Sequence, residues 1–109
     1  MTGYHAHVYF TSESRPEAES LLARIAGAGF RLQYIGKLID RPIGPHPLPM
    51  FEIDFDVAEE PAILDFLRQH RGTLSVLVHE VTGHDLRDHT EGARWLGQRL
   101  ELDFTQLDS

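Results

Sequence analysis

Apolar and polar residues alternate along the first segment of the chain, residues 4–10. One face of this segment carries Tyr4, Ala6, Val8 and Phe10, and the other carries His5, His7 and Tyr9. A period of two is typical of a β-strand with one buried face. We therefore expect a strand over residues 4–10 whose two histidines lie opposite the core.

The spacing then changes to that of a helix. Ser14 is expected at the N-cap, with Glu17 completing a capping box and Pro16 in the first turn. Apolar residues follow three or four positions apart, at Ala18, Leu21, Leu22, Ile25 and Ala26. Gly27 and Gly29 indicate the end of this amphipathic helix.

Similar patterns continue to the C-terminus. We expect strands over residues 30–35, 51–57 and 74–79, and a helix that begins at Pro61 and ends at Gly72. Residues 40–49 contain Pro42, Gly44, Pro45, Pro47 and Pro49. This composition excludes a helix or a central strand and predicts a rigid loop. Beyond a turn at Gly83 we expect a short helix from Asp88 through Leu96, and then a tail with alternating apolar residues over 100–107.

The resulting order of elements is βαββαβ. This order predicts an α+β, ferredoxin-like sandwich, in which an antiparallel four-stranded sheet carries both helices on one face. A chain of 109 residues has the size of one compact domain, so we expect a single domain over residues 1–109.

Composition excludes several classes of function. The formal net charge of -7 argues against nucleic acids and anionic membranes as partners, because both require clustered Lys and Arg. The absence of cysteine excludes disulfides, thiolate metal sites and a cysteine nucleophile. No apolar run is long enough for a membrane span, and the N-terminus lacks the features of a signal peptide. We therefore expect a cytoplasmic protein.

The seven histidines are the chemically informative residues. The helices must cover the apolar face of the sheet, which leaves His5, His7, Tyr9 and Glu52 on the other face. In a ferredoxin-like sheet the fourth strand lies beside the first, so His79 is expected next to His7. His46, in the proline-rich loop, can bend over the same face. Imidazole ligands suit iron, zinc, copper and nickel, and two histidines with Glu52 would instead form a facial triad.

Other interpretations of these residues remain open. A His-X-His pair on a solvated strand face often binds nothing. His70 is expected to compensate a helix dipole, and His84 and His89 lie in an acidic turn where capping and surface pairing are ordinary roles. Glu52 could be a surface carboxylate, and Trp95 a core or interface residue.

Three stretches of the chain resemble the DOPA 4,5-dioxygenase family. They are Tyr4-His5-Ala6-His7-Val8-Tyr9-Phe10, then Gly44-Pro45-His46-Pro47 running into Met50-Phe51-Glu52, and Val78-His79 followed by Thr82-Gly83-His84-Asp85-Leu86-Arg87-Asp88-His89-Thr90. Trp95-Leu96-Gly97 follows behind them. The resemblance covers nearly the whole chain in order, with departures from the family's pattern at His5 and His84.

The resemblance implies a ferredoxin-like homodimer that cleaves a catechol such as L-DOPA with O2 and non-haem Fe(II). It implies His7, His46 and His79 as metal ligands, and Zn(II) or another divalent metal could occupy the same site in purified protein. His5 and His89 are then the candidates for proton transfer, and Tyr9 and Glu52 for substrate contacts. The natural substrate does not follow from the family.

Two rival functions use the same residues. One is a non-catalytic ferredoxin-like dimer that binds a small ligand or a metal on its open sheet face. The other is a zinc hydrolase. Conversion of a catechol in the presence of Fe(II) and air would discriminate the dioxygenase from both.

Overall fold

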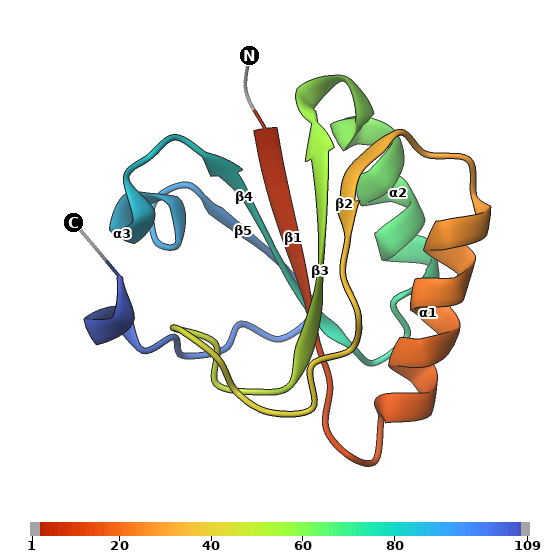
Figure 1. Cartoon of the computed structure of the whole chain (residues 1–109), viewed down its shortest axis with the longest axis horizontal. Coiled ribbons are helices and arrows are strands. Elements are labelled where there is room, and N and C mark those ends of the chain that lie inside the picture. Colours follow the sequence, from red (N-terminus) through yellow and green to blue (C-terminus); the bar gives the residue numbers. More distant parts are fainter. Residues whose placement is uncertain (1–2, 108–109) are drawn as a thin grey trace.

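An antiparallel sheet with strand order β2-β3-β1-β4-β5 forms the frame of the protein in the computed structural model, which describes residues 3–107 (Figure 1). The strands are β1 (Gly3–Tyr9), β2 (Leu32–Ile35), β3 (Met50–Asp56), β4 (Ser75–Val81) and β5 (Ala93–Leu96). The helices are α1 (Arg15–Gly27), α2 (Glu60–His70) and the one-turn α3 (Asp85–Asp88), with 3-10 turns at Val57–Glu59 and Phe104–Gln106. The first four strands and the two long helices have the predicted ferredoxin-like arrangement.

Both long helices cover one face of the sheet, and the main core lies between them and the strands (Figure 1). Alternation along β1 places Ala6 and Val8 in this core, together with Phe51, Ile53 and Phe55 of β3, as the sequence pattern predicts. Within residues 3–107, no helix combines the length and the apolar character that crossing a bilayer requires.

The predicted helix from Asp88 through Leu96 is wrong. Helix α3 ends at Asp88, and residues 93–96 form a fifth strand that pairs with β4, with Val76 opposite Leu96. The side chains explain the difference, because Leu96 packs in the main core whereas Trp95 packs on the other side of the sheet. This period of two belongs to a strand.

The predicted capping box is also wrong, although α1 begins where expected. Ser14 occupies the N-cap position, but its hydroxyl accepts a hydrogen bond from the Thr11 N–H at 2.9 Å. The Glu17 carboxylate accepts hydrogen bonds from the Thr73 N–H and hydroxyl, each at 2.8 Å. Glu17 thus ties α1 to the turn before β4 instead of capping its own helix.

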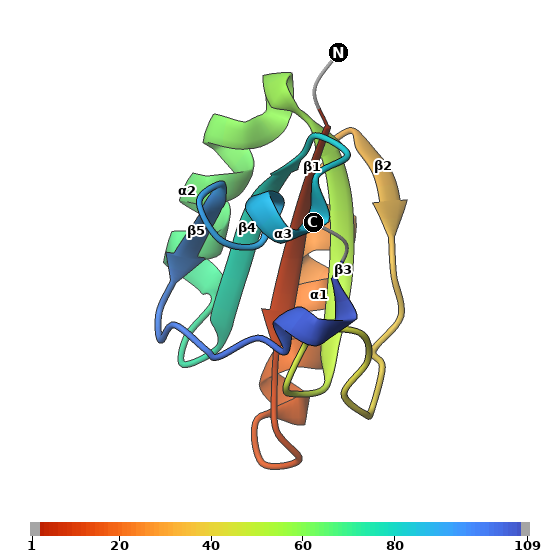
Figure 2. The same ribbon diagram turned by 90° about the vertical axis from the view of Figure 1, so that its left-hand side faces the viewer.

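The helix-free face is covered by the chain itself. A second apolar cluster there comprises Tyr9, Met50, Leu77 and Leu102, bordered by Ile39, Ile43, Leu48, Ala93, Trp95 and Leu100. Figure 2 shows the C-terminal segment and α3 in front of the sheet, with the long helices behind it. Leu77 and Met50 are 0% and 2% exposed, so the chain itself buries these apolar residues of the sheet face.

Candidate metal centre

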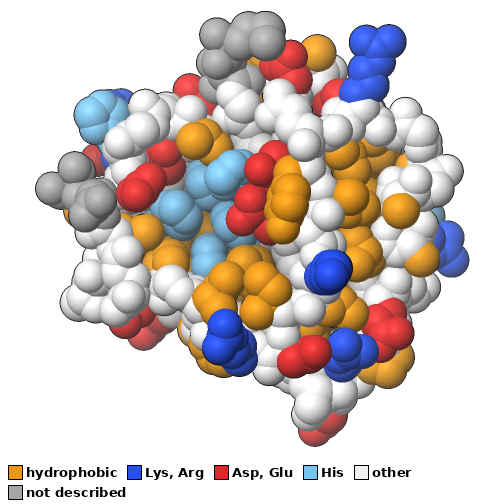
Figure 3. Space-filling view, viewed as in Figure 1, with side chains coloured by type: hydrophobic (Ala, Val, Ile, Leu, Met, Phe, Trp, Pro, Cys, Tyr) orange, Lys and Arg blue, Asp and Glu red, His pale blue; other side chains and the backbone are white. Residues whose placement is uncertain are grey.

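Five of the seven histidines gather on the helix-free face, where Figure 3 shows them in a hollow beside acidic side chains. They are His5 and His7 on β1, His79 on β4, His46 in the loop before β3, and His89 directly after α3. The ring centroids of His7 and His46 lie 4.2 Å apart, as do those of His79 and His89. His70 lies elsewhere, at the end of α2 against Phe66, and His84 is exposed at the N-cap of α3.

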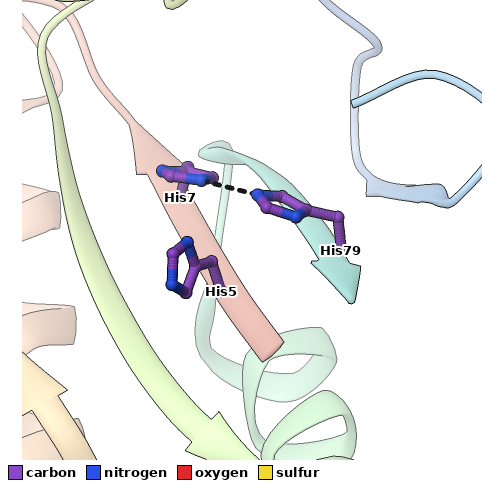
Figure 4. Close-up of side chains that lie close together, drawn as sticks. All are labelled: His5, His7 and His79. Atoms are coloured by element: carbon purple, nitrogen blue, oxygen red, sulfur yellow. Dashed lines mark hydrogen bonds between the residues drawn. The ribbon is translucent and has the colours of Figure 1, made fainter. Parts of the chain in front are cut away.

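The pairing of β1 with β4 brings the strand histidines together. The register sets His5 opposite His79 and His7 opposite Leu77, so the predicted neighbours His7 and His79 are diagonal. Their rings nevertheless meet, with 3.1 Å between the two Nε2 atoms (Figure 4). Both side chains are only 3% exposed.

The loop that carries His46 is held at several points. Pro45 and Pro47 restrict the backbone on both sides of His46. The His46 N–H donates to the Ile43 carbonyl at 2.9 Å, and the Asp103 N–H of the C-terminal segment donates to the Pro45 carbonyl at 2.8 Å. His46 is 7% exposed, as expected of a side chain folded over the sheet face.

The Asp88 carboxylate stabilises the turn that positions His89. Its carboxylate is 3% exposed and accepts hydrogen bonds from the Thr82 N–H at 2.8 Å and the Thr82 hydroxyl at 2.5 Å. Burial opposes ionisation, but these hydrogen bonds lower the pKa of Asp88. Through Asp88, the acidic turn therefore joins the end of β4 to α3. From the sequence, Asp88 was expected only to begin a short helix, and its hydrogen bonds to Thr82 were not anticipated.

Backbone carbonyls fix the Nδ1 atoms of two of the clustered histidines. His79 Nδ1 lies 3.0 Å from the Glu80 carbonyl oxygen, and His89 Nδ1 lies 2.7 Å from that of Asp85. Because a carbonyl oxygen can only accept a hydrogen bond, both Nδ1 atoms carry a proton. Each ring, when neutral, has its lone pair on Nε2, which is the usual arrangement for a histidine that binds metal.

His46 and His7 are held differently. His46 Nδ1 lies 2.7 Å from the Tyr9 hydroxyl oxygen, which leaves its Nε2 available. His7 Nε2 can donate to His79 Nε2, but His7 Nδ1 then remains buried without a hydrogen-bond partner among residues 3–107, 3.6 Å from a Glu52 oxygen. An unpartnered buried nitrogen costs free energy unless a ligand uses it.

The spacing of these nitrogens fits a metal ion. Nitrogen–metal bonds of about 2.0–2.1 Å at angles of roughly 90–110° set adjacent ligand atoms roughly 2.8–3.4 Å apart. The 3.1 Å between the His7 and His79 nitrogens falls in that range. Within residues 3–107, ligand atoms lie within 4.8 Å of one another in the set His5, His7 and His79 and in the set His7, His46 and His89. The three expected ligands are thus divided between two sets that share His7.

Burial keeps these imidazoles neutral. It lowers the pKa of both His46 and His79 to about 4, with the nearby His89 adding to the effect. Burial also lowers the pKa of His7 well below its ordinary value, and the surrounding imidazoles act in the same direction. Neutral imidazoles can bind a cation at physiological pH without first losing a proton.

Two carboxylates of β3 border the cluster. His5 lies 3.8 Å from a Glu52 oxygen and 3.5 Å from an Asp54 oxygen, and these three residues form a third set within 4.8 Å. Burial and the neighbouring Asp54 raise the pKa of Glu52 to about 8. Glu52 therefore holds a proton at neutral pH, and a facial triad through Glu52 requires that proton to be displaced. Tyr9, the other expected substrate contact, is 1% exposed and touches His46.

The fold and this site define the chain as an α+β protein with a cluster of histidines that could hold a metal ion. The sequence profile of the Dopa 4,5-dioxygenase family matches residues 4–106. The chain is 30% identical to the DOPA 4,5-dioxygenase of Amanita muscaria over 95% of its length, and 32% identical to an uncharacterised 21.2 kDa protein of Botryotinia fuckeliana over 94%. It covers 49% and 61% of those two proteins.

A solved structure agrees with this match. A crystal structure from Nostoc punctiforme PCC 73102, described only provisionally as a dioxygenase, superposes with a TM-score of 0.88 at 37% sequence identity. The match covers 97% of this chain and 90% of that one. The chain belongs to the Dopa 4,5-dioxygenase family, as its sequence motifs predict.

Proposed function

We propose that this protein is an extradiol, ring-cleaving dioxygenase that opens a catechol with O2 and non-haem Fe(II). The observation that carries the proposal is the convergence of five histidines, of which three have Nδ1 engaged in a hydrogen bond to oxygen. Neutral nitrogen ligands without thiolate suit Fe(II), although they suit zinc as well. The dioxygenase family supplies the reaction class, and L-DOPA is one candidate substrate because a relative's name includes it.

We assign His7, His46 and His79 as the residues that would hold the metal. Their side chains are between 3% and 7% exposed and come from β1, the proline-rich loop and β4. A bound Fe(II) would supply the Lewis acidity that favours loss of the catechol protons and the redox capacity to use O2. His79 is held ready to bind it, since its Nδ1–H donates to the Glu80 carbonyl and its Nε2 keeps the lone pair.

His89 and His5 are the candidates for proton transfer. The Nε2 atom of His89 can accept the proton of a catechol hydroxyl, because its Nδ1 already donates to the Asp85 carbonyl. His5 is 31% exposed beside Glu52 and Asp54, so it can exchange protons with solvent through this face. The ring centroids of His5 and His89 lie 5.3 Å and 4.2 Å from that of His79, which supports both as candidates beside an expected metal ligand.

Reconstitution tests the proposal. Metal-free protein is loaded with Fe(II) without oxygen, then mixed in air with L-DOPA, protocatechuate, caffeate and simpler catechols while absorbance is followed. A yellow ring-opened product is expected with Fe(II), whereas the Zn(II) form should bind catechol without converting it, because zinc has no redox step. If no catechol is converted by freshly loaded protein, the non-catalytic ligand-binding module replaces the dioxygenase.

A further inference from the structure

A second hollow lies beside the histidine cluster, between β3 and the segment that follows β2. Its volume is about 340 Å³, and its lining includes Lys37, Ile39, Ile43, Met50, Glu52 and Asp54. Glu52 belongs to both regions, because it also approaches His5 and His7. A ring held at the histidines would therefore have room beside it for a substituent.

The backbone after β2 determines which side chains face this hollow. The Gly36 N–H donates to the Glu52 carbonyl at 2.8 Å, and Ile39 forms an antiparallel bridge with Met50. Leu38 packs against the main core on the helix side, and Ile39 packs against the apolar cluster on the histidine side. The exposed Lys37 lies between them: it lines this hollow together with Ile39, and it also lines a hollow on the helix side with Leu22 and Leu38.

Lys37 brings an uncompensated positive charge to this acidic region. It is the single lysine of the chain, and it forms no ion pair within the part described, residues 3–107. The nearby carboxylates of Glu52 and Asp54 instead lie within 4.0 Å of imidazole nitrogens of His5. A free ammonium group on a flexible stem is suited to bind an anionic group of a ligand.

We propose that Lys37 binds a carboxylate on the side chain of the substrate and so makes the protein prefer acidic catechols to neutral ones. The catechol oxygens would be held at the histidines, and the substituent would extend over Met50 and Ile39 toward the Lys37 ammonium group. The inference rests on the proposed function for the place of the ring. It adds Lys37 as a determinant of specificity, a role that the family relationship does not assign to any residue.

Binding to the Zn(II)-loaded protein tests this inference without turnover. Calorimetry compares 3-(3,4-dihydroxyphenyl)propanoate with 4-ethylcatechol, which lacks only the carboxylate. The acid should bind the unmodified protein about tenfold more tightly, equivalent to about 1.4 kcal/mol, and Lys37→Met should remove this preference. Lys37→Arg should retain most of the preference, because it keeps the charge. Arg41→Gln is the matched control, since Arg41 is an exposed cation that does not line the hollow.

Each result of these binding and kinetic measurements either supports or overturns the role of Lys37. Equal affinities of the two ligands, failure of both to bind, or a preference that survives in Lys37→Met and Lys37→Glu would overturn the role of Lys37. With the Fe(II) form, Lys37→Met should raise KM for the acid about tenfold with kcat little changed, and leave both constants for 4-ethylcatechol unchanged. Absence of turnover with every catechol would refute the dioxygenase, while the binding comparison would still decide the Lys37 inference.

Discussion

At the scale of single residues, the main chemical feature of the cluster is that its imidazoles are buried and neutral. In the metal-free protein the pKa of His46 and His79 is about 4, against 6.5 for an ordinary histidine, so below pH 6.5 the unfolded chain binds protons that the folded chain does not. The free energy of unfolding therefore decreases as pH falls below 6.5, by up to about 1.4 kcal/mol per pH unit for each histidine.

Glu52 acts in the opposite direction. Its pKa in the folded protein is about 8 against 4.5, so the folded state retains a proton that the unfolded state has lost. Stability from this group is present at low pH and is lost as pH rises toward 8. The urea midpoint of metal-free protein should therefore peak near pH 6.5, and Glu52→Gln should flatten the alkaline side. A midpoint that stays constant from pH 6.5 to 5 would show that the histidines are not neutral and buried.

The ligand assignment makes a prediction about metal content. His7→Ala, His46→Ala and His79→Ala should each lower the metal bound per chain, because each removes a nitrogen from the cluster. His5→Ala and His89→Ala should retain metal and slow turnover by roughly 10²–10⁴-fold, as expected for a lost acid–base group. His70→Ala and His84→Ala are the controls outside the cluster. Metal analysis after chelator-free purification checks this, and unchanged content in the first three variants would refute the assignment.

The residues of the cluster were predictable to different degrees. Alternation alone places His5 and His7 on the helix-free face, and a ferredoxin-like sheet brings His79 to them. The burial of these rings was not predictable, because it depends on the long-range cover supplied by the loop and the C-terminal segment. His89 was expected to act, but its place against His79 depends on the hydrogen bonds between Asp88 and Thr82.

The elements of this fold were easier to predict before residue 80 than after it. Strands and helices with long periodic patterns appear within a few residues of their expected bounds. Strand β5 has four residues, which is too short for its period to be distinguished from that of a helix. The C-terminal segment has an apolar pattern, but only the folded structure shows that Leu102 packs against Tyr9, Met50 and Leu77.

The C-terminal segment should therefore contribute both to stability and to metal binding. Leu102 is 8% exposed, and Leu102→Ala should cost about 2–3 kcal/mol of unfolding free energy, measured in urea. Metal affinity should fall too, because the next residue, Asp103, holds the Pro45 carbonyl beside His46. Phe104→Ala, at a side chain 45% exposed, should change stability by less than about 0.5 kcal/mol. Equal effects of the two substitutions would show that the segment is not anchored at Leu102.

Across the whole molecule, the sheet still offers surface for a second copy. Tyr34 and Ile35 on the edge strand β2 are 52% and 41% exposed, and Val81 at the end of β4 is 40% exposed. A homodimer that covers such side chains remains our prediction, since two-fold association is the commonest way to bury them. Light scattering at micromolar concentration should give twice the mass of the chain, and Ile35→Glu should lower it. A monomer under these conditions would contradict the prediction.

At the same scale, we propose that the histidine cluster would hold Fe(II) and that the protein would then open a catechol ring with O2. The most direct measurement follows O2 consumption and product mass together, in Fe(II)-loaded protein given a limiting amount of catechol. The account predicts one O2 consumed per catechol, a product whose mass is that of the substrate plus both oxygen atoms, and no reaction with His46→Ala or with Zn(II). A product formed without uptake of O2, or O2 uptake that yields an intact quinone ring, would contradict it.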